Sequence, residues 1–228
     1  MPYIGQAPAP KVITSSDLAD DVVTADKIGD TAISGFSALG AEPADTDELL
    51  VSDAGTLKRM DYSYIKGGGI TVADQWRLNT NLSPSGTSLE IITANLERVD
   101  TSGQGTLGTA MSESSGIFTF PSTGIWLVRA SIQYQNDGTT TRYLQNYMQV
   151  TTNNSAYTTI TEASSNISGG SGSTYQQCPA QSLIDVTDTT QVKVKFGFLV
   201  ADNGGGMTIY ASSTTNRTYF TFIRLGDT

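Results

Sequence analysis

The sequence contains no histidine and only one cysteine, and these absences exclude several kinds of site. Without histidine, neither a Ser-His-Asp triad nor a Cys-His pair can form. The single thiol, Cys178, allows no intrachain disulfide and cannot complete a cysteine-based zinc site. Cys178 precedes a proline near a predicted strand, and we interpret it as a small buried or half-buried side chain. We therefore expect no metal and no cofactor.

Charged residues are scarce, at 15% of the chain, and the net charge is −9. Residues 1–66 carry 11 acidic and 5 basic side chains, whereas residues 67–228 carry 11 acidic and 8 basic ones. No basic stripe is present, which argues against a nucleic-acid partner. An anionic surface would repel the chain. We therefore expect any binding to depend on shape, ring stacking and hydrogen bonds.

Long apolar runs are also absent. No stretch of 18 or more apolar residues exists, so we expect no membrane insertion. The first residues lack the basic and apolar segments of a secretory signal, and we expect the protein to be synthesised and to fold in a host cytoplasm, even if it works outside one. Gly, Ser and Thr are abundant instead, which is typical of an all-β protein of an extracellular or virion surface.

The N-terminal third has a different character from the rest. Residues 1–13 contain Pro2, Pro8 and Pro10 and indicate an extended peptide, in which Tyr3 and Ile4 are apolar anchors. By themselves these residues fit a disordered tail and a docking peptide that is ordered on a partner equally well. The family resemblance given below favours docking, through Pro2, Tyr3 and Ile4.

Residues 14–33 contain two copies of a decapeptide, in which Leu18 matches Ile28 and Asp20 matches Asp30. Two such copies cannot bury their own apolar face, but three chains side by side could. Alternatively, the copies are short amphipathic helices, since Ser or Thr followed by acidic residues is also typical of helix N-caps. Either way, residues 14–66 predict an attachment region, not a domain that is stable alone.

The sequence predicts a hairpin next, with strands at Glu48–Ser52 and Thr56–Met60 around an Asp-Ala-Gly turn. Gly67 to Gly69 then predict a hinge, where we place the domain boundary. We expect residues 67–89 to be hinge and lead-in, and residues 90–228 to form the head.

After residue 70 the apolar pattern changes to a period of two. The spacing of strands and turns predicts an all-β jelly-roll sandwich. The expected strands are Glu90–Val99, Gly116–Phe120, Ile125–Tyr134, Tyr143–Thr151, Tyr157–Glu162, Gln181–Val186, Gln191–Val200, Met207–Ala211 and Thr218–Leu225. The segment Ser164–Gln177, rich in Gly and Ser, predicts a long loop that forms a variable tip.

Two segments of the head resemble the C1q/TNF superfamily. They are Phe118-Thr-Phe-Pro-Ser-Thr-Gly-Ile-Trp-Leu-Val128 and the terminal run Arg217-Thr-Tyr-Phe-Thr-Phe-Ile-Arg-Leu225. Trp126 stands where the family often has Tyr, and Val128 where it often has Phe. The segments around Trp76-Arg-Leu78 and Asn95–Asp100, and the N-terminal decapeptides, resemble structural proteins of marine tailed phages. These resemblances imply a trimeric fibre or knob on a virion, with an N-terminal attachment region and a C-terminal C1q-like head.

The residues themselves also favour an assembly. One predicted strand has Ile125 and Leu127 on one face, and Trp126 and Val128 on the other. A strand that is apolar on both faces fits a sandwich whose outer face is covered by a neighbouring subunit. We therefore assign one aromatic and aliphatic set to the core or the homotrimer contact: Phe118, Phe120, Trp126, Val128, Tyr219, Phe220 and Phe222.

Candidate receptor contacts are aromatic and amide side chains in or near predicted loops, because rings stack on sugars and amides give directional hydrogen bonds. An equally supported alternative places several of the tyrosines in the core or at the subunit contact. The candidates are Tyr134, Asn136, Tyr143, Tyr157, Tyr175 and Gln176.

Two other kinds of chemistry remain formally open. Glycoside hydrolysis needs only two carboxylates, but most acidic residues of the head lie in predicted turns, where they serve the backbone. Asp185, Asp188, Asp202 and Asn203 offer oxygen ligands for Ca²⁺, although turn formation explains them better. We therefore expect no catalytic residues.

The sequence leads to one principal expectation and two alternatives. We expect a phage fibre or knob protein on the virion surface, held to other virion proteins by its N-terminus and presenting its head to a host glycan. The first alternative is a capsid decoration or head-fibre protein that stabilises the particle. The second is a glycan depolymerase.

Overall fold

The computed structural model describes residues 12, 14, 17–19, 34–65, 69–138, 141–201 and 206–228, apart from the side chains at 141 and 142. The chain divides into two units, Met1–Lys66 and Gly67–Thr228. The proposed docking residues Pro2, Tyr3 and Ile4 and most of the decapeptide repeat lie outside the described residues, as do Asp202 and Asn203. Among the described residues, no helix is both long enough and apolar enough to cross a membrane.

The first unit contains the predicted hairpin. Strand β1 (Glu48–Asp53) pairs with β2 (Thr56–Asp61) in antiparallel register, with Asp53 opposite Thr56. The two turn residues, Ala54 and Gly55, both have positive φ, at 49° and 85°. That turn matches the right-handed twist of the flanking strands, which is why Gly is favoured there. A 3₁₀ turn, η3 (Tyr62–Tyr64), follows the hairpin.

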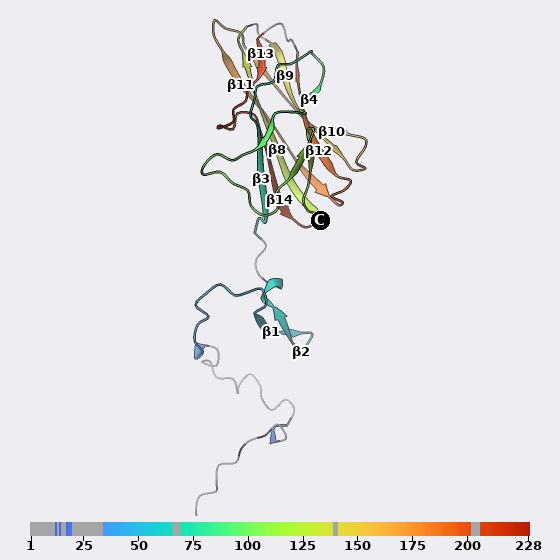
Figure 1. Cartoon of the computed structure of the whole chain (residues 1–228). Helices are drawn as coiled ribbons and strands as arrows, with labels where there is room; N and C mark the ends of the chain where they lie inside the picture. The colour runs from blue at the N-terminus through green and yellow to red at the C-terminus, as the bar shows by residue number, and fades with distance from the viewer. Residues whose placement is uncertain are drawn as a thin grey trace, which may run out of the picture. The chain divides into compact units, whose positions relative to one another are not determined.

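The second unit, called the head from here on, is a sandwich of two antiparallel sheets (Figure 1). The first sheet has the strand order β11-β8-β14-β3-β5, with β13 also paired to β8; the second has the order β10-β9-β12-β7-β6, with β4 also paired to β12. The strands are β3 (Val72–Leu78), β4 (Glu90–Ile91), β5 (Leu96–Arg98), β6 (Ser112–Ser114), β7 (Ile117–Thr119), β8 (Gly124–Asn136), β9 (Thr141–Thr151), β10 (Thr158–Ile167), β11 (Thr174–Val186), β12 (Lys193–Val200), β13 (Met207–Ile209) and β14 (Tyr219–Gly226).

The order in which the chain visits the sheets makes the sandwich a jelly roll. The chain passes from β7 in the second sheet to β8 in the first, returns for β9 and β10, and crosses again for β11 and for β12. Apart from the consecutive pairs β9–β10 and β6–β7, the strands that lie side by side are therefore not consecutive in the chain, as in other double-sheet jelly rolls. The expected all-β jelly-roll class is confirmed by this strand order.

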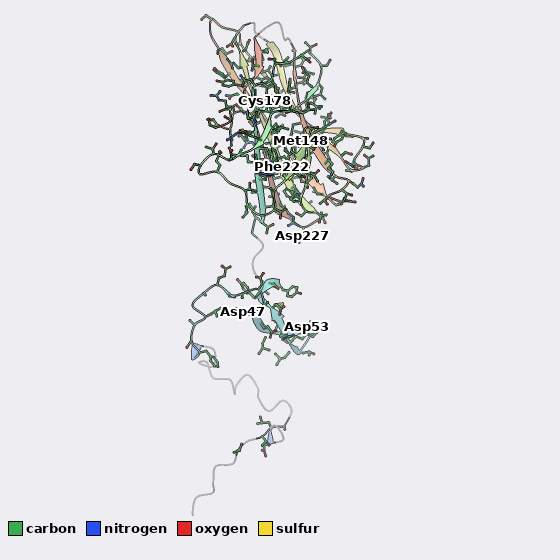
Figure 2. All side chains as sticks on the ribbon, in the orientation of Figure 1. Asp47, Asp53, Met148, Cys178, Phe222 and Asp227 are labelled. Carbon is green, nitrogen blue, oxygen red and sulfur yellow. The ribbon has the colours of Figure 1, made fainter. Side chains whose placement is uncertain are left out.

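The core lies between the two sheets and is supplied by the inward side chains of their strands. In β8, the side chains of Trp126, Val128 and Ala130 are fully buried, while those between them face outward. Met148 of β9 and Phe222 of β14 come from opposite sheets, and both are buried between them (Figure 2). This period of two is what a half-buried strand requires.

Aromatic side chains fill the centre of the core. Phe196 of β12 and Phe220 of β14 stack with ring centroids 4.3 Å apart, and Phe118 lies 5.0 Å from Phe222. Trp126 packs against Phe120 at 5.2 Å. Such aromatic pairs contribute about 0.5–1.5 kcal/mol each beyond the area they bury. The two segments that carry the C1q/TNF resemblance thus meet in one cluster.

The head begins earlier than expected. Residues 67–89 were predicted to be hinge and lead-in, but Val72–Leu78 forms β3, which pairs with β14 and β5 inside the first sheet. The sequence did not predict this strand because two of its buried side chains are charged. Asp74 is buried and accepts from the backbone N–H of Met111 at 2.9 Å, and Arg77 is buried and donates to Glu97 at 2.7 Å. These long-range polar partners therefore add to the core contacts of Val72, Trp76 and Leu78 in holding β3 in place.

Two other predictions about strands are corrected. The expected strand Glu90–Val99 is two short strands, β4 and β5, in different sheets, and Asn95 between them has a φ of 62°. The expected long loop Ser164–Gln177 is mostly strand, because β10 continues to Ile167 and β11 begins at Thr174. Ile167 is buried and supplies an apolar anchor that the Gly- and Ser-rich composition concealed.

The first and last strands of the head lie side by side. Val72 at the start of β3 is opposite Arg224 near the end of β14. The same end of the sheet holds Gly124, the first residue of β8, while Asn136 at the other end of β8 is opposite Thr174. The segment 168–173 therefore lies at the end of the head remote from its first and last residues.

Candidate functional site

The outer face of the first sheet carries an apolar row that crosses four strands. Leu183 of β11 is opposite Leu127 of β8, which is opposite Ile223 of β14, which is opposite Ala73 of β3. Leu183 is 62% exposed, and the other three are half-buried. Apolar side chains aligned directly across strands form a continuous stripe on one face of a sheet. We call these four residues the apolar row.

A polar row runs parallel to the apolar row, two residues later on β8 and β3 and two residues earlier on β11 and β14. Gln181 of β11 is opposite Arg129 of β8, which is opposite Thr221 of β14 and then Gln75 of β3. The amide of Gln75 donates to the hydroxyl of Thr221 at 2.8 Å. Arg129 is exposed and forms no ion pair with the described residues. The apolar row and this polar row together are called the banded face.

A shallow hollow lies on the banded face. It has a volume of about 310 Å³ and is lined by residues of both rows together with Tyr219. A second hollow beside it, of about 290 Å³, is lined by Arg129, Pro179, Ala180 and Gln181. The banded face therefore combines exposed apolar area, an unpaired guanidinium and a concave surface, which together favour contact with another macromolecule.

The outer face of the second sheet is of a different kind. Along β9, Tyr143, Gln145, Tyr147 and Gln149 alternate with buried residues and point outward. We call these four residues the tyrosine–glutamine strip. Tyr143 is 40% exposed, and the other three are half-buried. Because β9 is paired with β10 on one side and with β12 on the other, the strip lies on an interior strand of its sheet.

Hydrogen bonds hold the strip in one arrangement. The Tyr147 hydroxyl donates to the amide oxygen of Gln145 at 2.8 Å, and the Gln145 amide donates to the Ser164 hydroxyl at 3.2 Å. The Gln149 amide donates to the Thr159 hydroxyl at 3.1 Å. Burial, followed by the neighbouring Glu162 carboxylate, raises the pKa of Tyr147 above its usual value. The Tyr147 hydroxyl therefore stays protonated at neutral pH.

Two candidates for receptor contact do not lie at the surface, and that prediction is wrong for both. Tyr134 and Asn136 have the same parity in β8 as Trp126, so their side chains face inward and are fully buried. The Tyr134 hydroxyl donates to the backbone carbonyl of Gln145 in the other sheet, at 2.6 Å. The Asn136 side-chain oxygen accepts from the backbone N–H of Gly138 at 3.0 Å.

Of the other four candidates, three lie on two different outer faces, whereas Gln176 is opposite the inward Tyr134 and has the inward parity of β11. Tyr143 belongs to the tyrosine–glutamine strip. Tyr157 lies near the Gln149 end of the strip, because the ammonium of Lys195, which is opposite Gln149, is 4.0 Å from the Tyr157 ring centroid. Tyr175, 49% exposed, lies on the first sheet with its ring 5.2 Å from that of Tyr210. Gln176 is half-buried and donates to the backbone carbonyl of Gln177.

The seven residues assigned to the core or the trimer contact divide between the outer surface and the core. Tyr219 is half-buried on the banded face beside the hollow. The other six lie in the core between the sheets: Phe118, Phe120, Trp126, Val128, Phe220 and Phe222.

Sequence reasoning missed most of both outer faces. Gln145, Tyr147 and Gln149 were not chosen, although Tyr-x-Gln-x-Tyr-x-Gln repeats with the period of a strand. The run from Tyr219 to Ile223 was expected to be apolar on both faces, but Thr221 and Ile223 were not assigned to a contact. In both strands, the parity of the buried aromatic or aliphatic residues indicates which side chains face outward.

Asp188 and the thiol of Cys178 are held by local hydrogen bonds and by burial. Asp188 accepts from the backbone N–H and the hydroxyl of Thr190, both at 2.7 Å, and these bonds lower its pKa. Cys178 is buried, and burial raises the pKa of its thiol. Within the described ranges, no group of three or more Cys, Asp or Glu side chains is arranged to hold a metal ion.

Comparisons with known proteins give a likeness of fold. No family model matches the sequence, and no curated protein matches it. Among solved structures, murine APRIL at pH 8.0 is similar to this chain with a TM-score of 0.46 at 11% identity. The matched region covers 68% of this chain and 98% of the APRIL chain. Eiger TNF from S. frugiperda has a TM-score of 0.48 at 11% identity, covering 70% of this chain and 96% of its own.

Proposed function

We propose that this chain is a structural protein of a tailed-phage particle, and that its head is a homotrimeric binding module. The N-terminal region would fix the protein to other virion proteins, and the head would be presented to the surface of the host. The proposal assigns the protein a binding role and no catalytic one.

The observation that carries the proposal is the apolar row on the banded face. Fully burying a Leu or Ile side chain stabilises an assembly by up to about 1.5–3 kcal/mol, and by less for those already half-buried. Leu183, Leu127 and Ile223 offer such area on every copy, and a closed assembly of identical chains buries all of it. The C1q/TNF resemblance of β8 and β14, the two strands at the centre of the row, supports a trimer as that assembly.

The low charge density supports the same role. A chain with few charges and a net charge of −9 has little electrostatic attraction for nucleic acid or acidic lipid. Specific contact therefore falls to the two outer faces of the head, where side chains are held by cross-strand register. The phage assignment itself rests on the resemblance of the N-terminal and lead-in segments.

A truncation tests both halves of the proposal. Deleting residues 1–12 should leave the head associated as trimers, as measured by sedimentation equilibrium, and should abolish incorporation into particles. Incorporation of the truncated chain at the normal level would contradict the anchoring role. A monomer at micromolar concentration, for the full chain and the truncated chain alike, would contradict the trimer.

A further inference from the structure

We propose that the tyrosine–glutamine strip on β9 is a binding site for neutral carbohydrate. The inference deepens the proposed function and rests on it for the source of the sugar, a polysaccharide of the host surface. The strip lies on the sheet opposite the banded face, so the same head can associate with its copies and bind a glycan at once.

The arrangement of the strip suits an extended sugar chain. Successive outward residues on a strand lie about 6.6 Å apart, so the strip presents two rings and two amides in alternation along one line. Tyrosine rings offer apolar faces to the C–H groups of a pyranose, while amides bond its hydroxyls in defined directions. Tyr147 is opposite Gly197 on β12, and the side chains of Leu89 and Ile91 fill the space that a side chain at Gly197 would take.

The strip is organised before any ligand arrives. The bonds from Tyr147 to Gln145, from Gln145 to Ser164 and from Gln149 to Thr159 fix three of its four side chains. Preorganised side chains lose less conformational entropy on binding than free ones do. Within the described part of the chain, the Gln149 amide oxygen and the Tyr143 hydroxyl make no hydrogen bond, so both are available to sugar hydroxyls.

The charges beside the strip indicate a neutral ligand. Lys195 is opposite Gln149 on β12, and its ammonium lies over the ring of Tyr157. Glu162 is opposite Tyr147 on β10, and its carboxylate accepts from the amide of Gln145. One positive and one negative charge, each already engaged, leave no net charge to complement an acidic or a basic ligand. The net charge of −9 further disfavours acidic polysaccharides.

The exposed tyrosine on the first sheet is a weaker candidate and a useful control. Tyr175 packs against Tyr210, whose ring is covered by the Arg217 guanidinium at 3.9 Å. This cluster is on the outer side of the sheet that carries the banded face, where the proposed self-association takes place. Tyr175 therefore matches Tyr143 in residue type and exposure but not in its neighbours.

Titration of the full chain with defined sugars tests the proposal. The probes are neutral hexasaccharides of glucose, mannose and galactose, and a sulfated hexasaccharide serves as the acidic comparison. Calorimetry up to about 10 mM sugar detects even a millimolar site. We expect at least one neutral probe to bind the wild type, and the sulfated one not to bind. Tyr143→Ala and Gln149→Ala should each weaken binding about tenfold, a loss of about 1.4 kcal/mol, whereas Tyr175→Ala should leave it unchanged.

Three results would overturn the inference: no binding of any neutral probe, binding of the sulfated probe alone, or equal losses in Tyr143→Ala and Tyr175→Ala. Thermal melts of the variants establish that each is folded. Sedimentation of the same samples separates this inference from the proposed function. A trimer that binds no neutral sugar contradicts the strip alone, whereas a monomer whose sugar binding depends on Tyr143 contradicts the assembly alone.

Discussion

The two outer faces of the head differ in chemistry although they cover the same core. In β8 the outward residues include Leu127 and Arg129, whereas in β9 they include Tyr147 and Gln149. Most inward residues of the two strands, such as Val128 and Met148, are apolar and buried, and the inward Asn136 and Asn146 are buried as well. The difference shows that inward positions specify the sandwich, while outward positions are free to specify what each face contacts.

The largest expected effect comes from the core that both faces share. Trp126→Ala removes a fully buried ring that packs against Phe120, and it should lower the free energy of unfolding by about 3–5 kcal/mol. Urea denaturation measures the loss. Leu127→Ala, the adjacent outward residue, is the control and should cost clearly less under conditions where the chain is monomeric. Equal losses at the two positions would contradict the assignment of inward and outward sides.

A charge in the apolar row should separate assembly from folding. Ile223→Lys places an ammonium in the middle of the row, where an unpaired charge is costly to bury. We expect self-association to weaken at least about a hundredfold, equivalent to roughly 2.7 kcal/mol, with unfolding of the monomer little changed. Sedimentation velocity over a range of concentrations measures the shift. The matched change on the other face, Tyr143→Lys, should leave association intact, and a similar loss there would show that the faces are not distinct.

The smallest expected effect concerns Tyr134, which links the two sheets. Burial, followed by the nearby Cys178 and Tyr147, raises the pKa of Tyr134 well above its usual value of 10.0. The unfolded chain releases this proton near pH 10 while the folded chain retains it, so the stability it contributes is complete below pH 10 and is lost as the pH rises further. Tyr134→Phe should cost about 0.5–1.5 kcal/mol at neutral pH through the lost hydrogen bond.

The same variant should also flatten the decline of stability above pH 10, as measured by urea midpoints between neutral and alkaline pH. Tyr147 and Tyr157, whose pKa values are raised by burial, would keep part of the decline. Tyr175→Phe is the control, because that ring is exposed. An unchanged alkaline decline in Tyr134→Phe would show that its hydroxyl is accessible to water.

Local patterns in the sequence predicted those parts of the fold that local patterns determine. The alternation around Trp126 and Phe222 predicted β8 and β14, and the turn at Ala54 and Gly55 predicted the hairpin of the first unit. The all-β class followed from the spacing of such segments. In these places apolar period and turn chemistry agree with the tertiary structure.

Long-range contacts determine the parts that could not be predicted. Strand β3 contains Asp74 and Arg77, whose partners come from β5 and from the loop before β6, so its own sequence does not resemble a sheet strand. The outward rows were missed for a related reason. A row such as Leu183–Leu127–Ile223–Ala73 exists only once the register of four strands is known. Candidate contacts chosen one tyrosine at a time therefore included Tyr134, which is buried.

The adjacency of β3 and β14 has a practical consequence for anyone who wishes to label this protein. A tag fused after Thr228 would emerge beside the strand through which the chain enters the head, because Val72 and Arg224 are neighbours. An epitope inserted within residues 168–173 would instead be displayed at the opposite pole, next to Thr174 and Asn136. Antibodies against the two labels would thus bind at opposite ends of the head, one beside Val72 and Arg224 and the other beside Asn136 and Thr174.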